Sequence, residues 1–134
     1  MEHISINNLN LLKKEVDLLN KDVNIIAVSK TFSIEFIKPL INYGHIHFGE
    51  NKVQEALEKW TGIKKDFKNI KLHLIGKLQT NKVKFVLPLF DYIHSLDNEK
   101  LAQKISLEQK KVGFKPKIFI QVNIGNEIQK NGVD

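Results

Sequence analysis

The strongest constraint on the fold is an alternation of short apolar runs with longer stretches of helical periodicity. The apolar runs, each bounded by turn-forming residues, predict five strands, at residues 24–28, 45–48, 71–75, 92–96 and 117–122. Amphipathic or capped stretches around them predict helices at 7–20, 33–43, 51–60, 80–87 and from Asp97 or Asn98 to Gly113. Such alternation predicts a parallel sheet covered by helices.

Two parallel architectures fit this order, a doubly wound open sheet and a (β/α)8 barrel. An open sheet is complete with five strands, whereas a barrel needs about 200 residues or more, and the chain has 134. The pattern alone therefore favours the open sheet. No Pro-, Gly- or Ser-rich linker divides the sequence, so we expect residues 1–134 to form part of one domain.

Three residues punctuate the predicted helices. Ser33 is placed to cap the second helix, and Pro39 inside it predicts a kink or a break. Gly62 is expected to end the third helix.

Composition excludes some classes of function. The net charge of +6 comes with 21 lysines and no arginine, and the lysines are scattered among acidic residues, so we expect no nucleic-acid partner. The absence of cysteine excludes disulfides and thiolate chemistry. No apolar run is long enough to span a bilayer and the amino terminus does not resemble a secretory signal, so we expect no membrane association and a cytoplasmic location.

Lys30 follows the most apolar of the predicted strands and is the first candidate for chemistry. The carboxyl ends of parallel strands are where ligands bind in both α/β architectures. Partial burial there would lower the pKa of the amine from about 10.4 and favour the neutral form that Schiff-base chemistry needs. A lysine that extends from a strand end into solvent is the structural alternative.

Polar residues and glycines also follow the later strands. Gly49, Glu50 and Asn51 are ordinary choices for a turn and a helix start, and Gly76 follows the third strand. Taken together they suggest a site at one edge of the sheet. The five histidines show no metal-binding spacing, so we interpret them as strand-end or core residues and expect no metal site.

Four segments closely resemble the signature segments of the pyridoxal 5′-phosphate (PLP) homeostasis protein family, in the same order. They are AVSKT (27–31), FGENKVQE (48–55), HLIGKLQTNK (73–82) and QVNIGNE (121–127). The resemblance spans nearly all of the chain but only the amino-terminal part of the family's usual length. It implies a barrel of the alanine-racemase type, here incomplete at the carboxyl end with about five strands of eight.

The resemblance also implies a site and a function. Lys30 would hold PLP as a Schiff base, Asn51 would lie near the cofactor, and His73, Ile75 and Ser95 would line the same pocket. Members of the family are thought to buffer PLP and deliver it to PLP-dependent apoenzymes without catalysing a reaction, so PLP is the expected cofactor and an enzymatic activity is not expected.

The chain also departs from the family pattern. The family's phosphate-binding residues, which include an arginine-glycine segment, come from later strands that this sequence does not contain. Two alternatives stay open: a remnant or fragment without function, and a racemase-type PLP enzyme, for which Tyr43 and Tyr92 are poorly placed acid/base candidates. Five barrel strands leave two sheet edges open, so we expect self-association.

Overall fold

The structure is a computed structural model that describes residues 2–128 and 130–134. Its strands are β1 (Ala27–Val28), β2 (His47–Glu50), β3 (Lys71–Leu74), β4 (Tyr92–Leu96) and β5 (Lys117–Ile120). Its helices are α1 (Ile4–Leu19), α2 (Ile34–Tyr43), α3 (Val53–Asp66), α4 (Val83–Val86), which continues a 3-10 turn at Thr80–Lys82, and α5 (Glu99–Val112). The predicted β-α alternation is therefore confirmed.

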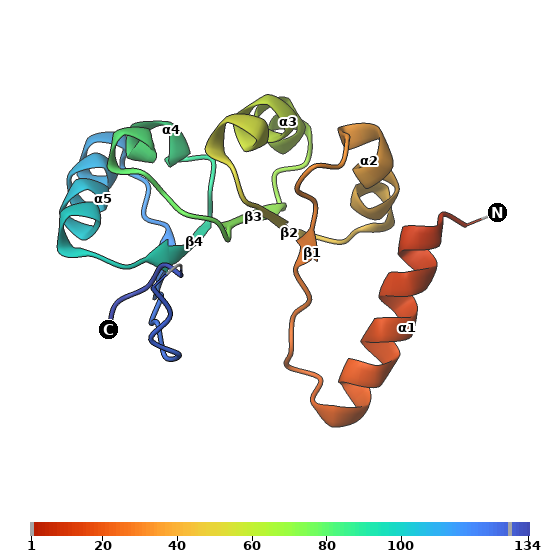
Figure 1. Ribbon diagram of the computed structural model, residues 1–134. Helices are drawn as coiled ribbons and strands as arrows, with labels where there is room; N and C mark the ends of the chain where they lie inside the picture. Colours follow the sequence, from red (N-terminus) through yellow and green to blue (C-terminus); the bar gives the residue numbers. More distant parts are fainter. Residues whose placement is uncertain (1, 129) are drawn as a thin grey trace.

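The strands form one parallel sheet in the order in which they occur along the chain, from β1 to β5. Crossover connections between parallel strands are right-handed, so a sheet whose order never reverses receives its helices on one face. Figure 1 shows α2, α3, α4 and α5 along that face. A doubly wound sheet has helices on both faces, so the open sheet favoured by the pattern alone is wrong. The incomplete barrel implied by the family resemblance is confirmed.

The hydrophobic core lies between the sheet and these helices. Phe48 of β2 and Trp60 of α3 are fully buried and pack against each other with ring centroids 5.0 Å apart. Further fully buried side chains come from the next strands and helices, including Leu72, Leu74, Val83, Val86, Phe90 and Ile93. Because side chains alternate across a strand, the residues between them face the opposite, concave side of the sheet.

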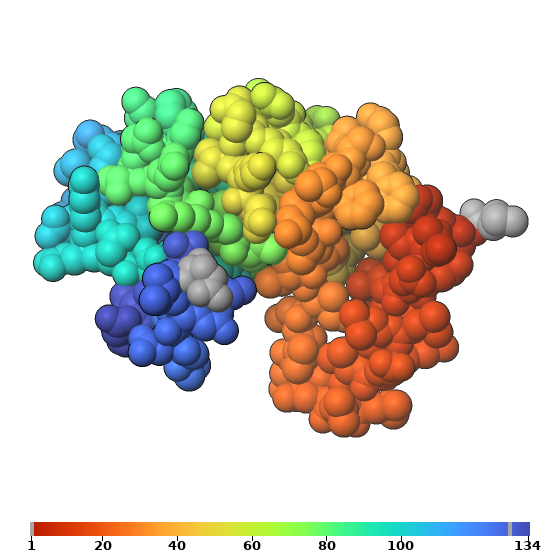
Figure 2. Space-filling model, in the orientation of Figure 1, coloured from red at the N-terminus to blue at the C-terminus, as the bar shows by residue number. Residues whose placement is uncertain are grey.

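The concave side of the sheet is open. Val28 at one edge and Phe119 at the other are each about half exposed, at 49% and 51%. Helix α1 contributes no buried residue, although Tyr43 of α2 donates a hydrogen bond from its hydroxyl to Asn10 Oδ1 at 3.0 Å. Figure 2 shows α1 and the segment after β5 projecting from the same side of the sheet, with open space between them.

Several local predictions differ from the structure. β1 is shorter than predicted, because this edge strand has β2 as its one neighbour. Gly62 lies inside α3, which continues to Asp66. Pro39 lies within a continuous α2, and Ser33 occupies the N-cap position without a side-chain hydrogen bond to the helix. In contrast, Asn98 caps α5 as predicted, accepting from the Leu101 backbone N–H at 2.8 Å.

Candidate functional site

Lys30 comes two residues after the end of β1, at the carboxyl edge of the sheet. Its neighbour Ser29 is buried, whereas Lys30 itself is exposed. Among the described residues no hydrogen bond or ion pair involves the Lys30 amine. The expected partial burial of Lys30 is wrong for this chain, because no described segment faces it across the concave side. The amine is therefore accessible from solvent.

The turn at residues 29–32 carries Lys30 and has an unusual conformation. The Phe32 N–H donates to the Ser29 carbonyl at 3.3 Å, which closes the turn. Thr31 has a φ of +66°, in the left-handed region that β-branched residues rarely adopt. A left-handed threonine costs of order 1–3 kcal/mol and persists only where surrounding contacts impose it.

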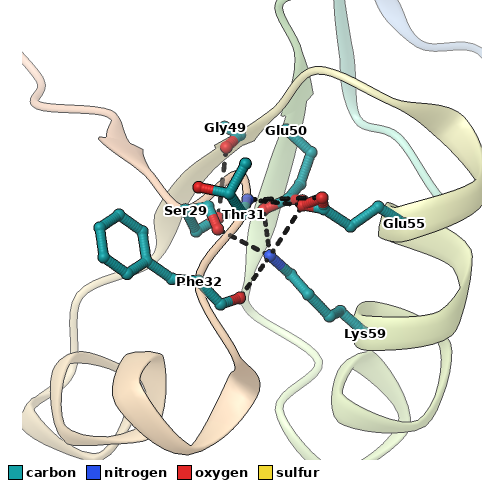
Figure 3. A network of polar contacts seen from close by, with 7 residues as sticks. All are labelled: Ser29, Thr31, Phe32, Gly49, Glu50, Glu55 and Lys59. Atoms are coloured by element: carbon teal, nitrogen blue, oxygen red, sulfur yellow. Dashed lines mark hydrogen bonds and ion pairs between the residues drawn. The ribbon is translucent and has the colours of Figure 1, made fainter.

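Helix α3 supplies those contacts (Figure 3). Glu55 accepts a hydrogen bond from the Thr31 backbone N–H at 2.6 Å. The Lys59 ammonium donates to the carbonyls of Ser29 and Phe32 at 2.6 and 2.8 Å. The bond from Thr31 lowers the pKa of Glu55, partial burial opposes that shift, and the charge of Lys59 lowers the pKa further. Glu55 is therefore ionised at neutral pH.

Glu50 connects this turn to the sheet. It is fully buried, and its Oε2 accepts from the Ser29 hydroxyl at 2.5 Å and pairs with Lys59 at 3.1 Å. Its Oε1 has no hydrogen-bond partner among the described residues. The interpretation of Glu50 as a residue at a helix start is wrong: it belongs to β2, and Lys52 occupies the N-cap position of α3.

Asn51 and Ile75 lie at the ends of the next two strands. Gly49, one strand over from Val28, has Ile75 on one side and Ile26 on the other, and a Cβ added there would lie 3.1 Å from Ile26 Cγ2. Gly76 packs directly on the backbone of Asn51, because a Cβ at Gly76 would lie 2.9 Å from Asn51 Cα. Lys30, Asn51 and Ile75 thus follow three consecutive strands at one edge.

Asn51 also borders a hollow of about 280 Å³. The other residues around it come from the start of α3 and from the segment after β3, and they are Lys52, Val53, Gln54, Lys77, Gln79 and Lys82. Three lysines make this hollow positively charged.

His73 is part of a chain of histidines that crosses the concave face. Its Nε2 lies 3.0 Å from His47 Nδ1, and its Nδ1 lies 2.9 Å from His94 Nε2. Tyr92 stacks on the His73 ring at 4.2 Å, and Phe119 stacks on His94 at 4.6 Å. Both ring nitrogens of His73 are therefore occupied by other side chains.

Burial affects the protonation of these histidines. It lowers the pKa of His73 to about 4, with further lowering from His94 and His47 and a small opposing effect from Asp91. Burial also lowers the pKa of His47 and His94. The three imidazoles are therefore neutral at pH 7. The described residues contain no group of three or more side chains arranged to hold a metal ion.

Ser95 lies near the carboxyl end of β4 but on the opposite side of the sheet from the concave face. It is buried, and its hydroxyl has no hydrogen-bond partner among the described residues. The pairing of β4 with β5 shifts by one residue between Ile93 and Leu96, so Ser95 lies in a β-bulge. Ser95 is buried like Ile93, on the side of the sheet that packs against helices.

The sequence did not single out Thr31 or Lys59, and it gave Glu55 no role. Their importance depends on a contact between α3 and the turn after β1. One signal was present in the sequence, since Glu55 and Lys59 stand four residues apart with the acidic residue first. That spacing predicts a helix-surface ion pair, and the structure shows this pair at 3.5 Å.

Solved structures share the fold of this chain over most of its length. PipY of Synechococcus elongatus is 35% identical with a TM-score of 0.78 in a structure without PLP, which covers 91% of this chain and 58% of PipY. A second PipY structure, with PLP bound, gives 33% identity and a TM-score of 0.75. An alanine racemase of Clostridium difficile, 17% identical with a TM-score of 0.71, shows the fold alone and is covered over 32% of its length. No family model matches the chain.

The fold is that of part of a (β/α) barrel, as in PipY and in alanine racemase. A pyridoxal phosphate homeostasis protein of Buchnera aphidicola is 39% identical over 140 residues, 99% of this chain and 60% of that protein. One from Escherichia coli is 33% identical over 115 residues, 84% of this chain and 49% of that protein. Over the length that it shares with them, the chain belongs to the pyridoxal phosphate homeostasis protein family. It spans about half to three fifths of these relatives.

Proposed function

We propose that this chain holds PLP as a Schiff base on Lys30 and acts in PLP homeostasis without catalysing a reaction. The observation that carries the proposal is the placement of an exposed lysine amine at the carboxyl end of β1, where residues 2–128 and 130–134 offer it no hydrogen-bond or ion-pair partner. Support comes from the solved relative with PLP bound, whose sequence is 33% identical. Delivery of PLP to apoenzymes in the cytoplasm is part of the proposal.

The chemistry requires little from the chain beyond an accessible, positioned amine. PLP supplies an aldehyde; the neutral Lys30 amine adds to its carbonyl carbon, a C=N bond replaces the C=O bond, and one water leaves. Solvent accepts the proton that the ammonium must first lose. Gly49 keeps the concave face beside Lys30 free of a side chain, and Asn51 and Ile75 follow the adjacent strands.

The part of the proposed site that this chain supplies is the lysine that would bind PLP covalently. The family resemblance assigns the phosphate-binding residues to later strands, and this sequence contains no arginine to replace them. A bound cofactor would therefore depend mainly on the bond to Lys30. The second candidate, a fragment that does not retain PLP by itself, is favoured by the open concave face.

A racemase-type activity has less support. Such an enzyme needs an acid/base group opposite the lysine, usually a tyrosine. The Tyr43 hydroxyl bonds to Asn10 of α1, and the Tyr92 ring stacks on His73. Both tyrosines are thus engaged in other contacts.

The proposal is tested by titrating the purified protein with PLP and recording the visible absorption spectrum. We expect a stoichiometric imine band in the wild-type chain, removed by borohydride and absent in Lys30→Ala. Lys110→Ala is the matched control, because Lys110 is also exposed and lies in the last turn of α5, at the opposite edge of the sheet from the carboxyl ends of the strands. An equal band in Lys30→Ala, or no specific band in the wild type, would contradict the proposal.

A further inference from the structure

The left-handed Thr31 is the starting point, because it directly follows the lysine that we assign to PLP. Glycine adopts a positive φ at little cost, whereas threonine does not. The chain nevertheless has threonine there, at φ +66°. The turn therefore depends on contacts from outside to hold this conformation.

Those contacts come from one turn of α3, and they reach the main chain on both sides of Lys30. Glu55 holds the Thr31 N–H at 2.6 Å, and Lys59 holds the carbonyls of Ser29 and Phe32 at 2.6 and 2.8 Å. Main-chain atoms of residues 29, 31 and 32 are thus all bonded to α3 (Figure 3). The side chain of Lys30 is exposed and makes no hydrogen bond or ion pair with the described residues.

The same contacts are anchored in the buried part of the molecule. The Lys59 side chain is 12% exposed and pairs with the fully buried Glu50 at 3.1 Å. Glu50 in turn accepts the Ser29 hydroxyl, and the Ser29 N–H donates to the Gly49 carbonyl at 2.9 Å. Buried, charge-assisted contacts have a restricted geometry. The turn is therefore attached to the rigid part of the sheet.

We propose that Lys59 and Glu55 are positioning residues for Lys30: they hold the 29–32 turn in a strained conformation and so direct the Lys30 amine to its reaction partner. The inference rests on the proposed role of Lys30 in binding PLP. Neither residue needs to touch the cofactor. Both act through the backbone on either side of the reactive lysine.

The test compares Lys59→Met, Lys59→Arg and Glu55→Gln with Lys64→Met. Lys64 is a matched control on the same helix, since it is also partly buried and bonds to the Leu89 carbonyl and to Asp91, each at 2.7 Å. Its loss removes similar contacts at a different place. Far-UV circular dichroism and urea unfolding show which variants are folded, and Glu55→Gln, with its more exposed side chain, serves if Lys59→Met does not fold.

Each variant is treated with limiting PLP and borohydride and, separately, with an amine-acylating ester. Peptide mass spectrometry then gives the label on Lys30 relative to the other lysines. We expect Lys59→Met and Glu55→Gln to lower the PLP label on Lys30 by roughly tenfold or more, because misplacing a reacting group by about 1 Å costs on that order. Lys59→Arg is expected to recover most of the label, and Lys64→Met to match the wild type.

Two results would overturn the positioning role: unchanged labelling in folded Lys59→Met and Glu55→Gln, or an equal loss in Lys64→Met. Failure of the proposed function gives a different result, in which wild-type PLP labelling shows no preference for Lys30. The rate at which the ester acylates Lys30 then still tests the positioning role. A rate that changes in the Lys59 and Glu55 variants but not in Lys64→Met supports the positioning role, and equal rates in all variants refute it.

Discussion

The burial of individual histidines on the concave face makes the stability of the protein depend on pH. His47, His73 and His94 form a row in which neighbouring rings are hydrogen-bonded through their nitrogens. In each contact one nitrogen must donate the hydrogen bond and the other must accept it, so neutral rings with matched tautomers satisfy both contacts. Protonation of His73 is disfavoured by burial and by its two histidine neighbours, and Asp91 offsets this only in part. The folded state therefore binds fewer protons than the unfolded chain in mildly acidic solution.

We expect the protein to lose stability as the pH falls from about 6.5 towards 4. The pKa of His73 is 6.5 in the unfolded reference and about 4 in the folded state, so the unfolded chain gains its proton first. Linkage gives a loss of roughly 2 kcal/mol from this group between pH 7 and pH 5. Urea unfolding at the two pH values measures it.

His73→Gln is the comparison for this pH effect, since it removes the titrating group. The pH dependence of its unfolding free energy should be clearly smaller, and a remainder should persist because the pKa values of His45, His47 and His94 are also lowered. The pKa values of Glu55 and Glu108 are lowered from 4.5, so these groups affect stability mainly below pH 4.5 and contribute little to the comparison between pH 7 and pH 5. Identical pH dependence in variant and wild type would refute the assignment.

At this scale the sequence indicated Lys30 but not what holds it. Lys30 could be singled out because it follows a recognisable apolar run. Thr31, Glu55 and Lys59 could not, because their roles depend on a backbone angle and on how α3 packs against the turn. The histidine chain likewise depends on the register of β2, β3 and β4, which residue periodicity does not specify.

At the scale of elements, two glycines with similar surroundings in the sequence have opposite roles. Gly76 lies against the backbone of Asn51, and the nearest atoms to an added Cβ are backbone atoms that cannot move aside easily. Gly62 lies in the interior of α3, and an added Cβ there meets nothing within 4 Å. Gly76 therefore permits the close contact of two strand ends, whereas Gly62 only weakens a helix.

We expect Gly76→Ala to destabilise the protein by about 1–3 kcal/mol or more, as overpacking against backbone atoms does. Gly62→Ala is the matched control and should stabilise it by about 0.5–1 kcal/mol, because alanine restricts the unfolded chain and favours helix. Chemical denaturation of both variants measures the two changes. A neutral Gly76→Ala would show that the Asn51–Gly76 contact is not tight.

Element types were more predictable than element ends. The five strands and their following helices were recognisable from apolar periodicity and turn residues. The end of α3 was not, because a single glycine costs only about 1 kcal/mol in a helix and packing of Trp60 on Phe48 opposes that cost. Likewise β1 spans only Ala27–Val28 and is shorter than the predicted strand at residues 24–28, since a strand at a sheet edge is paired on one side.

At the scale of the whole molecule, strand order separates the two architectures that the alternation allowed. A parallel sheet in chain order with helices on one face curves towards a barrel. In the described part of the chain, the two edge strands of the sheet, β1 and β5, each pair with one strand only. No helix in the described part of the chain is long and apolar enough to cross a membrane. The exposed apolar groups at the β5 edge, Ile120 and Ile124, are 67% and 91% exposed.

We predict concentration-dependent self-association through these open edges, measured by sedimentation velocity. Unpaired edge strands with exposed apolar side chains are templates for association. Ile120→Lys should weaken it, whereas Leu107→Lys, on the exposed surface of α5, should not. A monodisperse monomer at every concentration would contradict this prediction.

In the proposed function, the end of β1 presents one lysine among 21 as the reactive group. The most direct measurement mixes the wild-type chain with less than one equivalent of PLP and then adds borohydride, which reduces the imine and fixes the label. Peptide mass spectrometry then shows how the label is distributed over the lysines. We predict that most of the label lies on Lys30. A label spread over many lysines in proportion to their exposure would contradict it and would favour a fragment that does not retain PLP by itself.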